Sequence, residues 1–474
     1  MSSGLVRLYE YFVPGYREGM GRAGAVPLLT SDLLRKIREQ FNVDPKDTLR
    51  RAKRAIARSL TFEDLDRLIE HLDWAFQHPD AAIHDAVAKG TPVPRGFRFT
   101  GMEPGDSYKS IPDSNQFSDS DWTGFGLNCG ASLLADLAAA RAAFRWHTDH
   151  PSRFEYPLAP NANIALFSSF GTGLAHSWYI AKFIAVASPE AAIHLGGVYY
   201  AGKAAEVDAF YEAPLLPLVM ERELWSIPGH HDYLSGGEPF FTGLDTRRAG
   251  SLDGRLDGRL DGRPHRQEGS YFCLDSPAFR IIAIDGEYHS GTRYTEASLV
   301  RWLAEKVGEA KAAGRTVILL SANEPYAYAA RHEEDLLHDV TASLPPDAID
   351  LWFWGSSHHC AFFEPSDRLR PKFYGSCIGH GGYQCKRGRP STSPLNLTTA
   401  LWTETEPRFP EWTAIRQDLG NNGFCMMKLD DEQRTVTLDY IDWTNAPRAT
   451  IAMTTVDRRL EVSSVEPHPR PPCR

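Results

Sequence analysis

Short apolar runs alternate with helix-like segments along the middle of the chain. The runs at 164–167 (Ile-Ala-Leu-Phe) and 191–195 (Ala-Ala-Ile-His-Leu) are typical of buried strands, and a helix is expected between them at about 174–187. Similar runs predict further strands at 280–284, 316–320 and 350–354. This alternation predicts a layered α/β domain with ligand-binding loops at the ends of its strands.

The two ends of the chain have a different texture. Residues 1–155 are expected to form a mostly helical N-terminal extension, which closes with a helix over about 130–147. The α/β domain is expected over 156–445, and it ends with an antiparallel hairpin over 424–442. Residues 446–474 are predicted to be a C-terminal tail, because the last of them are rich in proline.

Charge and cysteine content limit the partners and the cellular compartment that we expect for the chain. Its 474 residues carry a net charge of −10, and the Lys and Arg residues are scattered, which argues against nucleic acid or an anionic membrane as a partner. No run of about eighteen apolar residues occurs, so no transmembrane helix is predicted. The first ten residues do not resemble a secretory signal. The seven dispersed cysteines form no CxxC pair, and we therefore expect reduced thiols in a cytoplasmic protein.

Five polar or glycine-rich segments follow the predicted strands and carry the candidate chemistry. In chain order they are 168–173 (SSFGTG), 196–200 (GGVYY), 229–232 (GHHD), 321–325 (SANEP) and 355–359 (GSSHH). In this order they resemble the motifs GDxG, GDxxY, GNH[ED], a strand-end histidine and GHxH of the calcineurin-like metallophosphoesterases, in their purple acid phosphatase branch. The resemblance implies two mixed β-sheets flanked by helices. It also implies, in typical members, two metal ions that activate a water and hold a phosphate.

Most positions that the resemblance assigns to metal ligands carry other residues in this chain. Ser169 stands in place of a metal-binding aspartate, and Gly197 in place of the aspartate that bridges the two ions. His230 replaces a ligating asparagine, while Ala322 and Ser356 each replace a histidine. Two divalent cations held close together without carboxylates would repel each other strongly. The sequence therefore predicts that the usual dimetal centre does not assemble.

The residues that remain allow two kinds of site. His231 and Asp232 match the family's catalytic histidine and its acidic partner, a pair that needs no metal for acid–base chemistry. Tyr200 and His358 match family ligands, and together with His230 they could hold a single ion, with iron and zinc as the candidates. In the other interpretation these three side chains pack in a pocket without metal. The remaining residues expected to line the pocket are Ser169, Gly197, Asn323, Ser356 and His359.

Three functions stay open on this evidence, and the sequence does not decide whether the protein is an enzyme. The first is a pseudoenzyme that binds a small molecule, for which a phosphate-containing ligand is the candidate. The second is an enzyme with repurposed chemistry at His231 and Asp232, with one metal ion or none. The third is phosphoester hydrolysis through an altered or mononuclear site that uses ligands such as Asp285, Glu324 or His359. The N-terminal extension is a candidate docking region for a protein partner.

Overall fold

The computed structural model of the chain describes most residues between 141 and 469. The segments that it leaves undescribed are 1–140, 173–174, 200–201, 234, 250–264, 290–293, 327–333, 356, 368–370, 384, 386–398, 408–419 and 470–474. The predicted helical extension over residues 1–140 therefore lies outside the described residues, as do Tyr200 and Ser356 of the predicted site.

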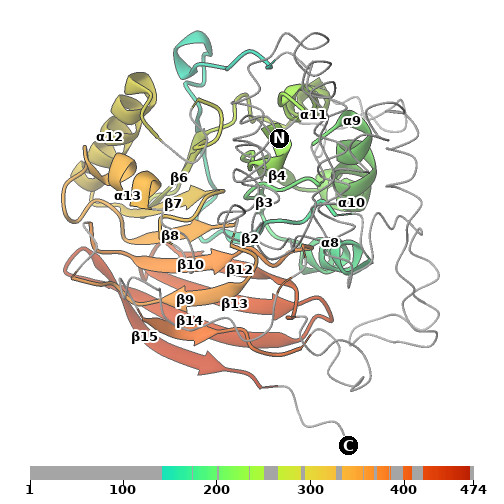
Figure 1. Cartoon of the computed structure of the whole chain (residues 1–474). Coiled ribbons are helices and arrows are strands. Elements are labelled where there is room, and N and C mark those ends of the chain that lie inside the picture. Colours follow the sequence, from blue (N-terminus) through green and yellow to red (C-terminus); the bar gives the residue numbers. More distant parts are fainter. Residues whose placement is uncertain are drawn as a thin grey trace, which may run out of the picture.

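Two mixed β-sheets form the body of the molecule (Figure 1). The larger sheet has the strand order β1 (Glu155–Pro157), β5 (Phe272–Asp275), β6 (Phe279–Ile284), β7 (Thr316–Ser321), β8 (Leu351–Trp354), β10 (Tyr374–Ile378), β9 (Cys360–Phe363) and β11 (Ala400–Thr403). The smaller sheet has the order β15 (Arg459–Pro467), β14 (Pro447–Val456), β13 (Thr435–Asp442), β12 (Gly423–Asp430), β2 (Asn163–Phe167), β3 (Ala191–His194) and β4 (Glu223–Ser226). The predicted class, a layered α/β sandwich of two mixed sheets, is confirmed.

Helices flank both sheets. Along the smaller sheet lie α8 (Ala175–Ala187), α9 (Ala204–Glu206), a π-helical turn (Val207–Glu212), α10 (Ala213–Val219) and α11 (Glu238–Ala249). Against the larger sheet lie α12 (Ala297–Ala312) and α13 (Glu334–Thr341), on the other side of the molecule (Figure 1). Two short 3₁₀ turns complete the described elements, at His147–Asp149 and His231–Tyr233. The second of these turns carries the predicted catalytic pair.

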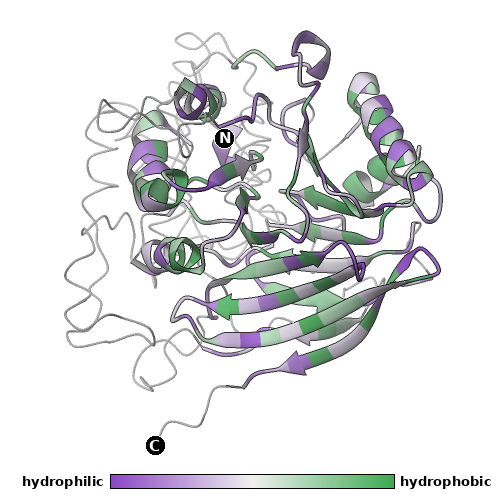
Figure 2. Ribbon diagram, turned by 180° about the vertical axis from the view of Figure 1, so that it is seen from behind, coloured by the Kyte–Doolittle hydropathy of each residue, from purple (hydrophilic) through white to green (hydrophobic). Residues whose placement is uncertain are grey.

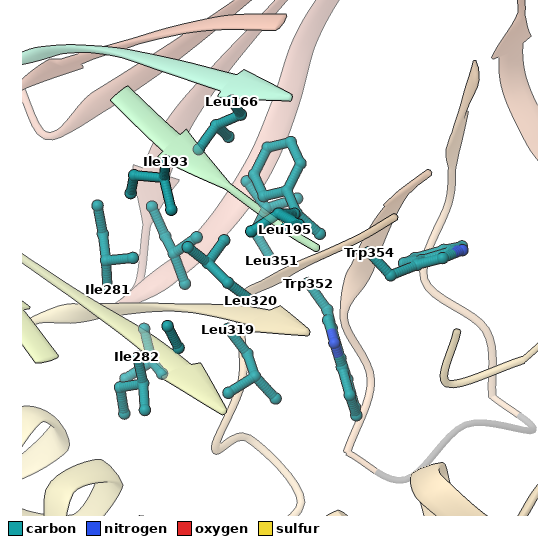
Figure 3. Close-up of a cluster of buried hydrophobic side chains, with 14 of the residues drawn as sticks. Leu166, Ile193, Leu195, Ile281, Ile282, Leu319, Leu320, Leu351, Trp352 and Trp354 are labelled. Atoms are coloured by element: carbon teal, nitrogen blue, oxygen red, sulfur yellow. The ribbon is translucent and has the colours of Figure 1, made fainter. Parts of the chain in front are cut away.

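The main core lies between the two sheets. Alternate residues of β2 and β3 point into it, and Figure 3 shows Leu166, Ile193 and Leu195 facing Ile281 and Leu351 of the larger sheet. The intervening residues of β2 and β3 pack in a second cluster with α8 and α10. Side chains alternate between the faces of a strand, so a strand that is buried on both faces reads as a continuous apolar run. This is why β2, β3, β6, β7 and β8 were predictable from sequence.

The smaller sheet extends beyond the predicted domain boundary at residue 445. Strands β14 and β15 pair antiparallel with each other, and β14 pairs with β13, so residues 447–467 belong to the sheet. Figure 2 shows hydrophobic and hydrophilic residues alternating along these strands, as expected for a sheet with one solvated face. The helix predicted over 130–147 differs as well, because residues 141–146 are non-helical. No helix in the described ranges is long and apolar enough to cross a membrane.

Candidate functional site

The predicted site segments follow strands of both sheets, and backbone hydrogen bonds join their loops. The loop after β2 is tied to the loop after β3, because the Ser169 N–H donates to the Gly196 carbonyl at 2.8 Å and the Tyr199 N–H donates to the Gly171 carbonyl at 2.8 Å. Parallel neighbours in one sheet end at the same edge, which brings these two loops together.

The loop after β10 closes against the same place from the larger sheet. The Tyr383 N–H donates to the Ser169 carbonyl at 2.8 Å, and the Gly381 N–H donates to the Ser168 carbonyl at 2.9 Å. Gly381 has no room for a side chain, since a Cβ there would lie 2.4 Å from the Ser168 carbonyl oxygen. The glycine-rich stretch before Tyr383 is therefore required for the close approach of this loop.

At Gly197 the surrounding atoms leave no space for a side chain, and we call this position the closed wall of the site. Its φ angle is +102°, a conformation that favours glycine. A Cβ at this position would lie 2.9 Å from the Ser169 Cα and 3.3 Å from the phenolic oxygen of Tyr199. The space that a side chain at 197 would need is thus filled by the Ser169 backbone and the Tyr199 phenol. The structure shows no room for a carboxylate at the position where the resemblance expects the bridging aspartate.

The Ser169 hydroxyl is engaged in a hydrogen bond within the protein. The residue adopts a left-handed backbone conformation with a φ of +52°, and its side chain is buried. Its hydroxyl donates to the carbonyl of Gly355, at 3.2 Å, in the loop after β8. This hydrogen bond joins loops of the two sheets.

Asp232 also joins loops. Its Oδ2 accepts hydrogen bonds from the amides of Gly197 and Gly229, both at 2.8 Å. Burial raises the pKa of this carboxyl to about 6, and the amide hydrogen bonds counter part of that rise because they favour the charged form. The two amides thus satisfy the hydrogen-bonding capacity of Oδ2 of Asp232. The expected role of Asp232 as the partner of His231 stays a prediction.

His231 and His358 belong to a compact group of rings that we call the His–Tyr cluster, made of Tyr199, His231, His358 and Tyr383. The Tyr199 ring lies 4.3 Å from the His231 ring and 4.9 Å from the Tyr383 ring, between centroids. His358 stacks on Tyr383 at 3.7 Å, and its Nε2 lies 3.2 Å from the Tyr199 hydroxyl. The cluster thus connects the loops after β3, β4, β8 and β10.

Sequence reasoning missed two members of this cluster, Tyr199 and Tyr383. It selected Tyr200 through the spacing of the second motif, although the adjacent Tyr199 contacts His358. The glycine run before Tyr383 indicated that this loop approaches the site closely. It did not indicate that Tyr383 is the residue placed there.

His230 lies beside a carboxylate that the sequence did not single out. Its Nδ1 is 3.3 Å from Oε2 of Glu287, in the loop after β6. The Glu287 side chain is 2% exposed and the His230 side chain 16% exposed. The neighbouring Asp285 structures this loop, since its Oδ1 accepts from the Glu287 amide at 3.0 Å and its Oδ2 accepts from the Tyr233 hydroxyl at 2.6 Å. The acidic residues after β6 were a signal for this pair.

Two more predicted pocket residues, Asn323 and His359, are buried. Asn323 is 6% exposed, and within the described structure its Nδ2 has no hydrogen-bond partner. This nitrogen lies 3.6 Å from the place where a Cβ on Gly286 would stand. The Nδ1 of His359 lies 2.8 Å from the Ser357 carbonyl oxygen and 3.8 Å from the Cys377 sulfur. Asn323 therefore presents a buried donor, whereas His359 is tied to its own loop.

The structure brings the predicted residues together in two places. His231 and His358 meet in the His–Tyr cluster, and His230 meets Glu287. Across the described ranges, no three His, Cys, Asp or Glu side chains are grouped so that they could hold a metal ion.

Comparison with the known protein families finds no match for this sequence, and comparison with the curated proteins finds none either. Among solved structures, the chain is similar to a purple acid phosphatase isolated from yellow lupin (Lupinus luteus) seeds, at 14% identity and a TM-score of 0.45 over 63% of this chain. That match covers 55% of the lupin enzyme, or about half of its length. The chain is also similar to a dimetal phosphatase from Danio rerio, at 11% identity and a TM-score of 0.39, over 62% of this chain and 99% of the other.

Proposed function

We propose that this protein is a metallophosphoesterase-like pseudoenzyme that uses the loops at its strand ends to bind a small ligand without the usual two metal ions. A ligand that carries phosphate is the first candidate. The observation on which the proposal rests is the closed wall at Gly197, where the site lacks both a carboxylate and the space for one.

A dimetal centre does not fit the residues that are present. The Ser169 hydroxyl donates to the Gly355 carbonyl, Gly197 has no side chain, and Ala322 offers no donor atom. The Gly197 amide, in turn, is held by Asp232. Without a carboxylate between them, two divalent cations would repel each other at short distance in a low-dielectric pocket.

The buried amide of Asn323 supports a binding role. An unsatisfied buried donor costs about 1–3 kcal/mol, and an acceptor on a bound ligand would recover part of that cost. Phosphate oxygens are strong acceptors. His231 and His358, which are partly exposed, are the further groups that such a ligand would meet.

Metal content and phosphoester turnover test the proposal directly. We expect inductively coupled plasma mass spectrometry to find fewer than two equivalents of transition metal in the purified protein. We also expect wild type and His231→Ala to show the same background turnover on a panel of phosphomonoesters and phosphodiesters. Two tightly bound equivalents of metal, or robust turnover that His231→Ala abolishes, would contradict it.

A second candidate function is hydrolysis of phosphoesters at a single metal ion, and the His230–Glu287 pair favours it. Histidine ligands commonly donate their second ring N–H to a carboxylate, which orients the ring. Tyr200, His230 and His358 are the residues that would hold the ion, and the ion would supply an activated water. One equivalent of zinc or iron that is lost in His230→Ala, together with turnover that depends on it, would favour this function over the first.

A further inference from the structure

We propose that residues 141–146, which we call the strap, position the His231–Tyr233 turn of the site against the loop after β6. The strap directly follows residues 1–140, so it connects the site to the N-terminal part of the chain. The positioning role stands apart from the proposed binding function, whereas its effect on ligand affinity rests on that function. The observation that carries it is that Ala142 of the strap is bonded to both sides of the junction.

Ala142 joins the two sides through its backbone. Its N–H donates to the Gly236 carbonyl at 3.0 Å, just after the turn, and its own carbonyl accepts from the hydroxyl of Tyr288, in the loop after β6. The turn follows β4 of the smaller sheet, and the loop follows β6 of the larger sheet. The strap therefore ties a loop of one sheet to a loop of the other.

Arg141 adds a second link between the same two sides. Its Nη2 donates to the Glu287 carbonyl at 3.2 Å. Its guanidinium lies 4.5 Å from the centroid of the Tyr288 ring and 5.5 Å from the centroid of the Tyr233 ring. A cation is attracted to the face of an aromatic ring, so Arg141 holds the ring that ends the turn and the ring of the opposite loop.

The strap packs where the turn and the loop meet directly. The Tyr233 hydroxyl donates to Oδ2 of Asp285 at 2.6 Å, and the Tyr233 ring packs with Phe241 and Leu244 in a small apolar cluster. Ala142 and Tyr288 pack against this cluster. Loss of the links from the strap would therefore leave the turn less firmly held against the loop.

The other end of the strap is anchored outside this junction. Arg145 forms a paired contact with the carboxylate of Asp245 in α11, at 2.8 and 2.7 Å, and it donates to the Glu268 carbonyl at 3.1 Å. Arg141 is instead the residue next to the N-terminal 140 residues. We therefore expect a partner that binds those residues to act on the site through Arg141, which is a coupling between two sites.

Hydrogen exchange of the full chain, followed by mass spectrometry without ligand, tests the positioning role. Two amides report on the junction, since the Gly236 N–H donates to the Tyr233 carbonyl at 3.1 Å and the Tyr288 N–H donates to Oδ1 of Asp285 at 3.1 Å. In Arg141→Met we expect peptides that contain these amides to exchange about tenfold faster than in wild type. Peptides from the core strand β7 should exchange at the wild-type rate.

Arg315→Met is the matched control, because Arg315 forms a partly buried pair with Asp275, at 3.2 Å, outside the strap and the site. It should leave the junction peptides unchanged. Tyr288→Phe removes only the hydroxyl that holds Ala142, and it should accelerate the same peptides even where Arg141→Met fails to fold. Unchanged exchange in both folded variants, or an equal acceleration in β7, would overturn the positioning role.

Titration with inorganic phosphate tests the effect on the ligand. We expect the Kd of Arg141→Met to be at least about threefold above that of wild type, because the ligand must then order the turn. Tyr288→Phe keeps the charge of Arg141 and should change the Kd in the same direction. Bound phosphate should in turn slow exchange in the strap of wild type, because coupling is reciprocal.

Binding of phosphate with the same Kd in wild type and both variants would contradict the coupling. Absence of phosphate binding by wild type would contradict the proposed binding function, and the exchange experiment would still decide the role of the strap.

Discussion

Asn323 and Gly197 differ from the other residues of the site in the hydrogen-bond partners and the space that surround them. Most polar groups there are paired, as Ser169 is with Gly355 and Asp232 with two amides. In the described part of the chain the side-chain nitrogen of Asn323 has no partner, and Gly197 has no space for a side chain. Single substitutions at these two positions therefore test the site most directly.

Replacing Asn323 by leucine should raise the free energy of unfolding by up to about 1 kcal/mol, because it removes a buried donor that has no partner among the described residues. Ligand binding should be lost at the same time. Urea denaturation measures the first effect and calorimetric titration with phosphate the second.

Asn422→Leu is the control, because the Nδ2 of Asn422 donates to the carbonyls of His380 and Tyr383 at 2.8 and 2.9 Å. This variant should lose about 1–3 kcal/mol, since it removes two buried hydrogen bonds. An equal loss in both variants would show that Asn323 is a structural residue.

Replacing Gly197 by alanine should destabilise the protein by at least about 3 kcal/mol, because the new Cβ would combine an unfavourable φ with a 2.9 Å approach to Ser169. Gly314→Ala separates the two causes, since Gly314 has a φ of +68° and nothing within 4 Å of its Cβ position. We expect about 1 kcal/mol for that control. Similar losses in both variants, measured by thermal unfolding, would mean that the wall at Gly197 is not closed.

At the scale of elements, the two sheets are joined by polar contacts as well as by their apolar core. The hydroxyls of Ser376 in β10 and Tyr440 in β13 lie 2.7 Å apart. Arg448 in β14 is paired with Glu404, the residue after β11, at 2.9 Å, and both side chains are buried. These contacts link β10 and the end of β11 in the larger sheet to the long antiparallel strands β13 and β14 of the smaller one.

Arg448→Met should destabilise the protein by about 3–5 kcal/mol, because it leaves the buried Glu404 carboxylate without its cation. The double variant Arg448→Met/Glu404→Leu should recover at least half of the loss. Lys428→Met, which breaks an exposed pair with Asp439, is the control and should cost less than about 1 kcal/mol. Denaturation by urea gives all three values, and a double variant no more stable than the single one would contradict the argument.

The sequence predicted the elements that are buried on both faces and the hairpin of β12 and β13. It missed β4, β5, β9, β10 and β11. All of these except β9 contain a polar residue or a glycine, which shortens the apolar run. It ended the domain before β14 and β15 because the proline-rich end of the chain hid the alternation that precedes it. Short strands at these places are defined by their partners in the sheet rather than by their own residues.

The site was predictable only where a motif named a residue. His231 and His358 are brought together in the His–Tyr cluster, and Asn323 is buried in the loop after β7. Glu287 and Tyr199 could not be selected, because their roles depend on which loop packs against which. That glycine stands at 197 was visible in the sequence, but the backbone and the phenol packed against it were not.

At the scale of the whole molecule, three buried histidines make the native state sensitive to acid. Burial lowers the pKa of His194 to about 3 and the pKa of His265 and His380 to about 4. Each is neutral in the native state and takes up a proton more readily when unfolded. Their contribution to stability is therefore complete above pH 6.5 and is lost as the pH falls through about 4.

His194→Phe tests this sign. The ring of His194 packs against Phe167 and Tyr211 in the core, so phenylalanine should fill the same place. Relative to wild type, the variant should gain about 1 kcal/mol for each pH unit between 6.5 and 3. His338→Gln, at an exposed histidine, should show no such trend. Urea denaturation at several pH values gives the difference, and a gap that is constant with pH would contradict the prediction.

Asp232→Asn should show the opposite trend. Burial raises the pKa of Asp232 to about 6, so the native state binds its proton more readily than the unfolded state does between pH 6 and 3.8. The free energy of unfolding of wild type should therefore rise relative to that of this variant as the pH falls through that window. The same denaturation series measures it, and a gain of the variant over wild type on acidification would contradict the assignment.

The closed wall at Gly197 also constrains which mutational paths are open to this protein. A carboxylate at 197 would need both the Ser169 backbone and the Tyr199 phenol to shift. The effect of aspartate at 197 therefore depends on the residues already present around it. This is strong epistasis, and it means that accommodating a carboxylate at 197 would require several coordinated substitutions rather than one.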